Sequence, residues 1–325
     1  MENIDRIFWK GKKVLITGAA GFIGSHLSER LVHLGAMVRA FIRYNSMNSY
    51  GLIEAIPKDI RESIEISAGD ILDETSIFNA MKDVEVVFHM AALPSIPYSF
   101  LNPRHVFSVN TYGTLNMLLA AKACGVNKIV LASSAGASEK RPLLSPYVTS
   151  KAAMEKIGLG FHQGLETSVS IIRLFNNYGP RQSARAVIPT IISQALVRDD
   201  VHLGALEPRM DFNYISDTVE AFLRAAENVD TAGQVLTWGT RIYTSIAQLA
   251  QLTFSLIGKK GLHIVTDEER VRPDPGPMPS LEDDVLSTRK LLNFAPKLSL
   301  KDGLQKTINW ISQHIELYKT DIYTV

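Results

Sequence analysis

The feature that most constrains the fold is a short apolar run that ends in glycine and leads into a helical pattern. The run is KKVLITG at residues 12–18, and GFIGSHLSERLVHLG at residues 21–35 follows with apolar residues at helical spacing. Gly18, Gly21 and Gly24 are evenly spaced across the junction. Glycines at a strand–helix turn let the backbone approach a pyrophosphate, and the helix N-terminus favours the negative charge. The segment therefore predicts a dinucleotide-binding turn.

Strand and helix patterns alternate through the first half of the chain. After residues 12–35, strands are predicted at 36–44, 64–70, 85–92, 127–134 and 167–176, and helices at 76–84, 103–125 and 146–164. This alternation favours a parallel sheet covered by helices on both faces, with ligands at the carboxyl ends of the strands. The predicted fold class is α/β: a doubly wound parallel sheet of the Rossmann type with a smaller C-terminal α/β substrate-binding domain.

The alternation breaks after about residue 176. Prolines punctuate shorter elements there, VRPDPGPMPS at 271–280 reads as a loop, and residues 298–318 read as a capped terminal helix. We expect a dinucleotide-binding domain over residues 1–176 plus about 212–240. A nucleotide-sugar-binding domain would then comprise residues 177–211 and 241–325.

Composition narrows the class of protein. The 325 residues are 46% hydrophobic and carry a net charge of +1, which allows a sizeable core and favours neither nucleic acid nor a membrane surface as partner. The single cysteine, Cys124, excludes an internal disulfide framework. The first residues lack a signal-type apolar run, and no run reaches the roughly 20 residues of a membrane helix. We expect a cytoplasmic protein without a metal site.

The end of the second predicted strand bears on the choice of cofactor. An acidic residue there would accept a hydrogen bond from the ribose of NAD, whereas an arginine suits the 2′-phosphate of NADP. The chain has Ile42 at the acidic position, with Arg43 after it and Arg39 before it. NADP(H) is therefore favoured, and NAD(H) stays open. Asp70, after the third strand, can accept from the adenine amino group or cap the following helix.

The stretch LASSAGASEKRPLLSPYVTSK, residues 131–151, carries the predicted chemistry. Tyr147 and Lys151 are four residues apart on one helical face, so both can reach one site. The lysine is expected to lower the pKa of the phenol, which can then exchange a proton with a hydroxyl or ketone while a hydride moves to or from nicotinamide. Ser134, at the end of a strand, can bond the same oxygen. A Tyr-x-x-x-Lys pair is common by chance, but its place behind Ser-Ser in a chain with this glycine turn indicates a catalytic core.

The chain resembles the extended short-chain dehydrogenase/reductases, in the NAD-dependent epimerase/dehydratase family of nucleotide-sugar enzymes. The resemblance spans nearly the whole length and rests on TGAAGFIGSHL, HMAA, VNTYGTLNML, SPYVTSK, RLFNNYGPRQ and DFNYISDTVEAF. Within the family, VRAFIRYNSMNSYG, IPYSF, GPRQSARAVIPTII and TDEERVRPD are similar to UDP-N-acetylglucosamine 4,6-dehydratases of the legionaminic-acid type.

The resemblance implies roles for particular residues. Ser134, Tyr147 and Lys151 would be the catalytic triad, and Asn110 would support the active-site helix. The predicted cofactor contacts are Gly18, Gly21, Phe22, Ile23, Gly24, Arg43, Asp70, Ile71, Ala91, Ala92, Asn110, Tyr147 and Lys151. The predicted substrate contacts are Ser95, Asn176, Arg185, Val187, Pro189, Arg209 and Arg272, with Asn176 on the substrate diphosphate and Arg272 on a phosphate or ribose. A homodimer through the helices at 103–125 and 146–164 is also implied.

Two departures from the family pattern affect the expected reaction. The family commonly has an acidic pair just after the catalytic Ser, which serves proton transfer during loss of water, but this chain has Ala135 and Gly136. Glu139 lies nearby in a shortened loop and is the candidate replacement. The family also usually has Arg directly before the Asp of DFNYISD, and here Met210 stands there with Arg209 before it. A register shift would restore that contact, or Arg272 and Arg185 would replace it.

Hydride transfer at a sugar carbinol is therefore expected to survive and elimination to be lost. We predict a nucleotide-sugar oxidoreductase acting at C4 of a UDP-hexose or N-acetylhexosamine, by NADPH-dependent reduction of a 4-ketone. The alternatives are a 4-epimerase with retained cofactor, a 4,6-dehydratase with relocated acid and base, and a non-enzymatic dinucleotide-sensing scaffold. The intact triad argues against the scaffold.

Overall fold

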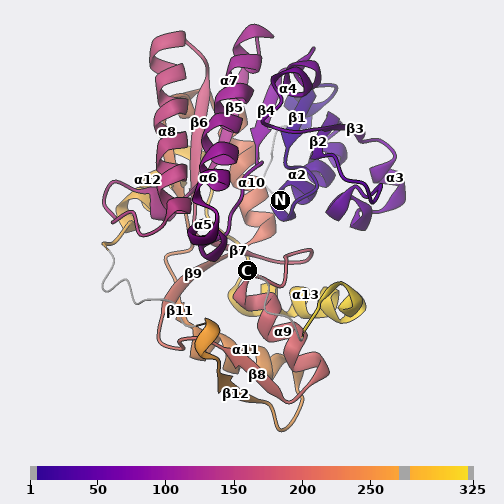
Figure 1. Cartoon of the computed structure of the whole chain (residues 1–325), viewed down its shortest axis with the longest axis vertical. Helices are drawn as coiled ribbons and strands as arrows, with labels where there is room; N and C mark the ends of the chain where they lie inside the picture. Colours follow the sequence, from indigo (N-terminus) through magenta and orange to yellow (C-terminus); the bar gives the residue numbers. More distant parts are fainter. Residues whose placement is uncertain (1–5, 271–278, 321–325) are drawn as a thin grey trace. The chain divides into compact units, whose positions relative to one another are not determined.

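A computed structural model describes residues 6–270 and 279–320. The chain divides into two compact units (Figure 1). The first comprises Met1–Leu174, Val219–Trp238 and Pro279–Phe294, and the second comprises Phe175–Thr218, Gly239–Met278 and Ala295–Val325. Compared with the expected domains, residues 175–176, 212–218 and 239–240 fall in the second unit and residues 279–294 in the first.

The first unit contains a seven-stranded sheet in which all strands run parallel. Its order is β10-β6-β5-β4-β1-β2-β3, which confirms the doubly wound α/β fold. The strands are β1 Lys13–Thr17, β2 Met37–Arg43, β3 Glu65–Gly69, β4 Val86–His89, β5 Lys128–Ser134, β6 Val169–Leu174 and β10 Val235–Trp238. The chain order reverses between β1 and β4, where such folds place their ligands.

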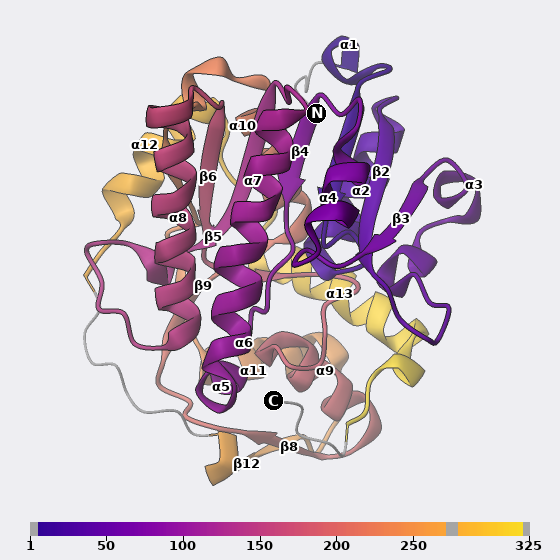
Figure 2. The same ribbon diagram turned by 45° about the horizontal axis from the view of Figure 1, so that its top comes forward.

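Helices cover both faces of this sheet. On one face α4 (Glu74–Met81), α7 (Gly113–Ala123) and α8 (Pro146–Leu165) run side by side (Figures 1 and 2). Leu15 and Leu131 from the strands form one buried cluster with Met117 of α7 and Met154 of α8. Because side chains alternate along a strand, Phe88 in β4 points to the opposite face.

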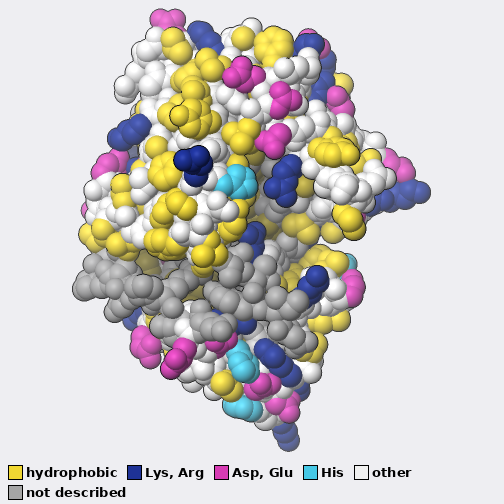
Figure 3. Space-filling model, viewed as in Figure 1, with side chains coloured by type: hydrophobic (Ala, Val, Ile, Leu, Met, Phe, Trp, Pro, Cys, Tyr) yellow, Lys and Arg dark blue, Asp and Glu magenta, His cyan; other side chains and the backbone are white. Residues whose placement is uncertain are grey.

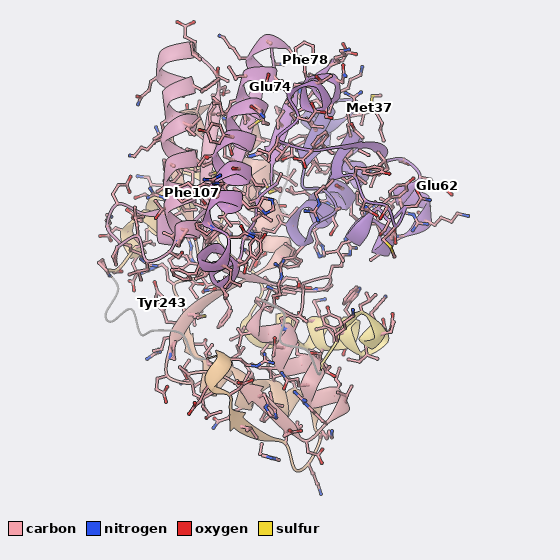
Figure 4. The ribbon with its side chains drawn as sticks, viewed as in Figure 1. Met37, Glu62, Glu74, Phe78, Phe107 and Tyr243 are labelled. Carbon is pink, nitrogen blue, oxygen red and sulfur yellow. The ribbon has the colours of Figure 1, made fainter. Side chains whose placement is uncertain are left out.

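On that opposite face, the ring of Phe88 packs against Trp9 and against Phe222 of α10 (Ile215–Glu227). Trp9 belongs to the short helix α1 (Arg6–Trp9). The other helices of this unit are α2 Phe22–His33, α3 Lys58–Arg61, α5 Ile96–Leu101, α6 Pro103–Phe107 and α12 Glu282–Leu292. Figure 4 labels Met37 at the start of β2, Glu62 after α3, and Glu74 and Phe78 on α4.

The long helix predicted at 103–125 is interrupted. It consists of α6, a π-helical turn at Ser108–Tyr112, and α7. Such turns insert one extra residue and often mark functional positions. Phe107, labelled in Figure 4, is the last residue before the turn, and Asn110 is buried within it.

The second unit is small and mixed. Strands β11 (Tyr243–Ser245), β9 (Arg209–Tyr214) and β7 (Asn176–Tyr178) form one sheet in that order, and β8 (Asp200–Leu203) pairs with β12 (His263–Thr266). Its helices are α9 Val187–Val197, α11 Ile246–Ile257 and α13 Leu300–Gln313. Helix α13 is the predicted terminal helix, and the Ser299 side chain caps it. In the part of the chain that the structure describes, no helix combines the length and apolarity needed to span a membrane.

Candidate active site

The glycine turn between β1 and α2 fits a dinucleotide pyrophosphate. Gly18 has a φ of +67°, and a Cβ on it would lie 2.7 Å from the backbone nitrogen of Ala91. A Cβ on Gly24 would overlap the Gly18 carbonyl oxygen. The turn thus touches the end of β4, and α2 packs onto it, only because these residues lack side chains. The first N–H groups of a helix, here those of Phe22 and Ile23, have no intrahelical acceptor and are suited to bind an anion.

The end of β2 offers one exposed arginine. Ile42 is buried, and Arg43, the last residue of the strand, is exposed. Arg39 has a structural role instead, because it donates to Glu65 at 2.8 Å and to the Ala80 carbonyl oxygen at 2.8 Å. Of the two arginines that favoured NADP(H) in the sequence, only Arg43 is therefore placed to meet a cofactor.

The residues after β3 differ in part from expectation. Asp70 is exposed, and its Oδ1 accepts from the Leu72 backbone at 2.9 Å, which closes a turn. Asp73, not Asp70, caps α4 by accepting from the Thr75 backbone at 3.1 Å. Capping by Asp70 was therefore wrong, and its second carboxylate oxygen stays compatible with the predicted adenine contact.

Three further predicted cofactor contacts follow β3 and β4. Ile71 is buried and packs tightly over Gly113 of α7, so its side chain contributes to the core. Ala91 and Ala92, after β4, are half-buried, and the Ala91 nitrogen donates to Thr17 Oγ1 at 3.2 Å. Small side chains here leave the carboxyl edge of the sheet accessible beside the glycine turn.

The predicted catalytic residues meet where β5 ends and α8 begins. The Ser145 side chain accepts from the Val148 nitrogen at 3.2 Å and starts the helix, which places Tyr147 in its first turn. Ser134 is the last residue of β5, and its side chain is hydrogen-bonded to Tyr147. Lys151 lies one turn further on, is buried, and donates from Nζ to the Ala132 carbonyl oxygen at 2.8 Å.

The protonation of this core differs from the sequence-based expectation. Burial raises the pKa of Tyr147 to about 12, and the bond to Ser134 only partly offsets it. Burial lowers the pKa of Lys151 to about 8, against the opposing charge of Glu155. The expected lowering of the tyrosine pKa by Lys151 is not seen, because burial is the largest contribution to the Tyr147 pKa. Tyr147 is therefore a phenol at neutral pH, which is the form that donates a proton.

Asn110 and Ser95 have defined structural contacts. Asn110 Oδ1 accepts from the Leu93 nitrogen at 2.8 Å, and its Nδ2 donates to Ser150 Oγ at 2.8 Å, so it joins the loop after β4 to α8. Ser95 is buried and caps α5 by accepting from the Tyr98 nitrogen at 3.2 Å. The implied support of the active-site helix by Asn110 stays a prediction, with which these two hydrogen bonds agree, and the Ser95 hydroxyl is engaged as a cap.

The positions of the missing acidic pair are tightly packed. Ala135 is only 3% exposed, and a Cβ on Gly136 would lie 3.1 Å from Val148 Cγ2. Ser134 Oγ also accepts from the Gly136 nitrogen at 3.3 Å, which closes the turn after β5. A carboxylate at either position would require this turn to move.

Glu139, the candidate replacement, is bound by two basic side chains. Its carboxylate lies 2.9 Å from Arg173 Nη2 and 4.0 Å from Lys156 Nζ. Burial alone would raise its pKa, but a backbone hydrogen bond and Arg173 outweigh this and lower it. A lowered pKa favours the ionised form, which is not the form that protonates a leaving hydroxyl.

Sequence reasoning missed the buried ion pair beneath this loop. Arg173 in β6 binds Glu155 of α8 with Nη2 2.7 Å from Oε2, and Ser133 Oγ donates to the same carboxylate at 2.5 Å. Arg173 is the one charged residue of β6, VSIIRL, and this is the signal that could have revealed the pair. Among the described residues, no group of three His, Cys, Asp or Glu side chains could hold a metal ion.

The remaining predicted substrate contacts belong to the second unit, which is described by itself. Asn176 opens β7, is exposed, and donates to the Asp211 carbonyl oxygen at 3.3 Å. Arg185 is exposed in the loop before α9, whose first turn contains half-buried Val187 and buried Pro189. Arg272 lies outside the described residues.

Arg209 lies at the start of β9. The pairing of β9 with β11 is continuous from Arg209↔Ser245 to Asp211↔Tyr243. Alternation along the strand places Arg209 and Asp211 on one face and Met210 on the other. Arg209 donates to the Tyr243 carbonyl oxygen at 2.8 Å, and its predicted substrate contact stays a prediction.

A glycine turn after β1, together with Ser134 at the end of β5 and Tyr147 and Lys151 on α8, is typical of dinucleotide-dependent enzymes of the short-chain dehydrogenase/reductase type. The family model for GDP-mannose 4,6 dehydratase matches residues 15–307. A UDP-N-acetyl-alpha-D-glucosaminuronate decarboxylase of Bacillus cytotoxicus is 31% identical, over 93% of this chain and 98% of that protein.

Solved structures agree with this likeness. Epimerase Mth375 of Methanothermobacter thermautotrophicus has a TM-score of 0.85 and 26% identity, covering 96% of this chain and 95% of its own. A UDP-glucuronic acid 4-epimerase of Bacillus cereus, in complex with UDP-glucuronic acid and NAD, has a TM-score of 0.82 and 26% identity, covering 93% and 99%. The chain belongs to the extended short-chain dehydrogenase/reductase family, among its NAD-dependent nucleotide-sugar epimerases and dehydratases. The narrower likeness to legionaminic-acid-type dehydratases stays a prediction.

Proposed function

We propose that the protein transfers a hydride at C4 of a UDP-sugar and does not eliminate water. The observation that carries this proposal is an assembled Ser134, Tyr147 and Lys151 core beside positions 135 and 136 that hold no acid and are closely packed. Glu139 is held by Arg173, which argues against the 4,6-dehydratase alternative. Relatives named for UDP-sugars support the substrate class.

The protonation of the core favours reduction of a 4-ketone. Tyr147, a phenol at neutral pH, would donate its proton to the C4 oxygen, while Ser134 holds the same oxygen by a hydrogen bond. Lys151, fixed on the Ala132 carbonyl, would keep a cationic group behind the site. The nicotinamide cofactor, when bound on the glycine turn, would supply the hydride. Solvent would return a proton to Tyr147 after each turnover.

NADP(H) is the cofactor we propose, with UDP-4-keto-6-deoxy-N-acetylhexosamine as substrate. Arg43 is exposed at the end of β2 and Ile42 is buried, so no carboxylate at these two positions would repel a 2′-phosphate. NAD(H) is the alternative, because solved relatives are described in complex with NAD.

A 4-epimerase with retained NAD is the second candidate function. Several similar proteins are named UDP-sugar 4-epimerases, and epimerisation needs the same triad and no acidic pair. In that case Tyr147, as the phenolate, would take the proton of the C4 hydroxyl while the C4 hydride moves to the nicotinamide. After the sugar has rotated, the hydride would return to the opposite face of C4 and Tyr147 would return the proton to the oxygen.

The test is a paired assay. Mixing the protein with UDP-4-keto-6-deoxy-N-acetylglucosamine and either NADPH or NADH should oxidise NADPH in proportion to the sugar, and faster than NADH. Absence of oxidation contradicts the reductase. UDP-N-acetylglucosamine without added cofactor separates the others, because a galacto product indicates the epimerase and loss of water the dehydratase.

We also propose a homodimer formed by the helices at 103–125 and 146–164. Tyr112 and Leu119 on this face are 64% and 49% exposed, and Leu165 at the end of α8 is 43% exposed. Figure 3 shows hydrophobic side chains in yellow on this side of the molecule. Such exposed apolar side chains are typical of a helix face that meets a second copy.

A further inference from the structure

His89, the last residue of β4, connects two parts of the proposed active site. Its ring is buried, with Nδ1 2.8 Å from Thr17 Oγ1 and Nε2 3.0 Å from Thr114 Oγ1. Thr17 directly precedes Gly18 of the glycine turn, and Thr114 belongs to α7. Both ring nitrogens therefore have partners, on two different elements.

The neighbouring contacts fix the direction of each hydrogen bond. Thr114 Oγ1 lies 2.7 Å from the Asn110 carbonyl oxygen, which can only accept, so the threonine proton points there. Thr114 must then accept from the ring, which places the ring proton on Nε2. On the other side, Thr17 Oγ1 accepts from the Ala91 nitrogen and has its own proton available for Nδ1.

In the resulting chain of hydrogen bonds, each group donates to the next. It passes from Ala91 through Thr17, His89 and Thr114 to the backbone of Asn110. Protonating Nδ1 would turn the Thr17 hydroxyl around and remove the acceptor of its proton. Burial, and secondarily the charge of Lys151, lower the pKa of His89 to about 3, which agrees with a neutral ring.

The far end of this chain leads to the catalytic helix. The Asn110 side chain donates to Ser150 Oγ at 2.8 Å, and Ser150 Oγ donates to the Tyr147 carbonyl oxygen at 2.7 Å. Asn110 lies in the π-helical turn, where the Thr114 bond holds its carbonyl oxygen. A shift at His89 would therefore move both the glycine turn and the support of α8.

We propose that His89 is a positioning residue, which as a neutral imidazole protonated on Nε2 sets the glycine turn against the helix that carries Tyr147 and Lys151. This role rests on the proposed function, because it matters only where cofactor and sugar must meet in one geometry. Misplacement by about 1 Å can lower a rate about a hundredfold. His89 itself takes no part in proton transfer.

Three variants test the two hydrogen bonds of His89 separately. His89→Asn can retain the bond at the Nδ1 position, His89→Gln the bond at the Nε2 position, and His89→Phe retains ring packing with neither. We expect kcat to fall about tenfold to a hundredfold in His89→Phe and less in the two amides, with sugar KM little changed. His33→Gln, at the exposed end of α2, is the matched control and should match the wild type.

Two measurements do not require a sugar substrate. Nitrogen-15 NMR of wild-type protein should show His89 protonated on Nε2 alone, with no titration between pH 5 and 8 around the ordinary value of about 6.5. NADH and NADPH binding by fluorescence should weaken when Thr17→Val or Thr114→Val breaks one bond. These readouts remain informative if no nucleotide sugar is turned over, which would contradict only the proposed function.

The outcomes against the proposal are specific. A titration near pH 6.5 or an Nδ1–H ring would contradict the hydrogen-bond assignment. An unchanged kcat in folded His89→Phe would reduce His89 to a packing role. Should that variant fail to fold, Thr114→Val keeps the side-chain shape and decides the same question, since unchanged dinucleotide binding and unchanged NMR shifts in it would overturn the proposal.

Discussion

At the scale of single residues, Arg173 explains why Glu139 is not available as a general acid. It lies inside β6 and binds Glu155 and Glu139 together, with Nη2 2.7 Å and 2.9 Å from their nearer oxygens. Glu155 is 2% exposed, so its carboxylate is buried against the Arg173 guanidinium. The Glu139 carboxylate, which the sequence suggests as a replacement acid, thus anchors the shortened loop to Arg173.

This arrangement predicts the behaviour of Glu139→Gln. Since Glu139 touches Arg173 at the surface side and does not reach into proton transfer, its neutral amide should keep turnover within about threefold of wild type, as expected for a partly exposed pair. Tyr147→Phe, which removes the proton donor, should lower turnover at least about a hundredfold while NADPH still binds. Steady-state kinetics on both variants make the comparison. A hundredfold loss in Glu139→Gln would identify a relocated acid and contradict this reading.

Residue types and spacing were sufficient to predict the glycine turn and the proximity of Ser134, Tyr147 and Lys151, whose catalytic roles stay a prediction. They could not predict that Lys151 donates to the Ala132 carbonyl oxygen or that Arg39 is engaged by Glu65, because both contacts depend on how separate elements pack. The hydrogen bonds of His89 also join three elements that are distant in sequence.

At the scale of elements, the glycine turn is a packing requirement as well as a binding one. Gly18 approaches the backbone of Ala91 at the end of β4, and Gly24 lies against the carbonyl of Gly18. The turn therefore aligns β1, β4 and α2 before any ligand binds. Removing either glycine should disturb the fold as well as the cofactor site.

A pair of alanine substitutions tests this packing. Gly24→Ala should lower the free energy of unfolding by about 1–3 kcal/mol or more, because its methyl group has no room against backbone atoms. Gly160→Ala in α8 has nothing within 4 Å of its new Cβ and should raise that free energy by about 0.5–1 kcal/mol through helix propensity. Urea unfolding measures both, and equal effects of the two substitutions would argue against a tight turn.

Most strands and helices of the first unit follow from periodicity, because buried parallel strands are short apolar runs between glycines. The interruption of the helix at 103–125 was not predictable, since a π-helical turn adds one residue without changing the apolar pattern over so short a distance.

At the scale of the whole molecule, the seventh strand of the sheet, β10, comes from residues that follow the end of the alternating strand and helix pattern. β10 pairs with β6, and α12 packs on β10, where the Thr237 nitrogen donates to Thr288 Oγ1 at 2.8 Å. The expected domains included β10 in the first unit but placed residues 279–294 in the second. Contacts between segments so far apart in sequence leave no local signal.

The proposed reaction is hydride transfer at C4 without acid or base chemistry at C5. An NMR spectrum of UDP-4-keto-6-deoxy-N-acetylglucosamine after reaction with protein and ordinary NADPH in D2O, beside a sample without protein, tests it. We expect the ketone to be replaced by a carbinol that carries protium at C4, with protium retained at C5. A persistent ketone with deuterium appearing at C5 faster than in the protein-free sample would contradict hydride transfer at C4 as the reaction.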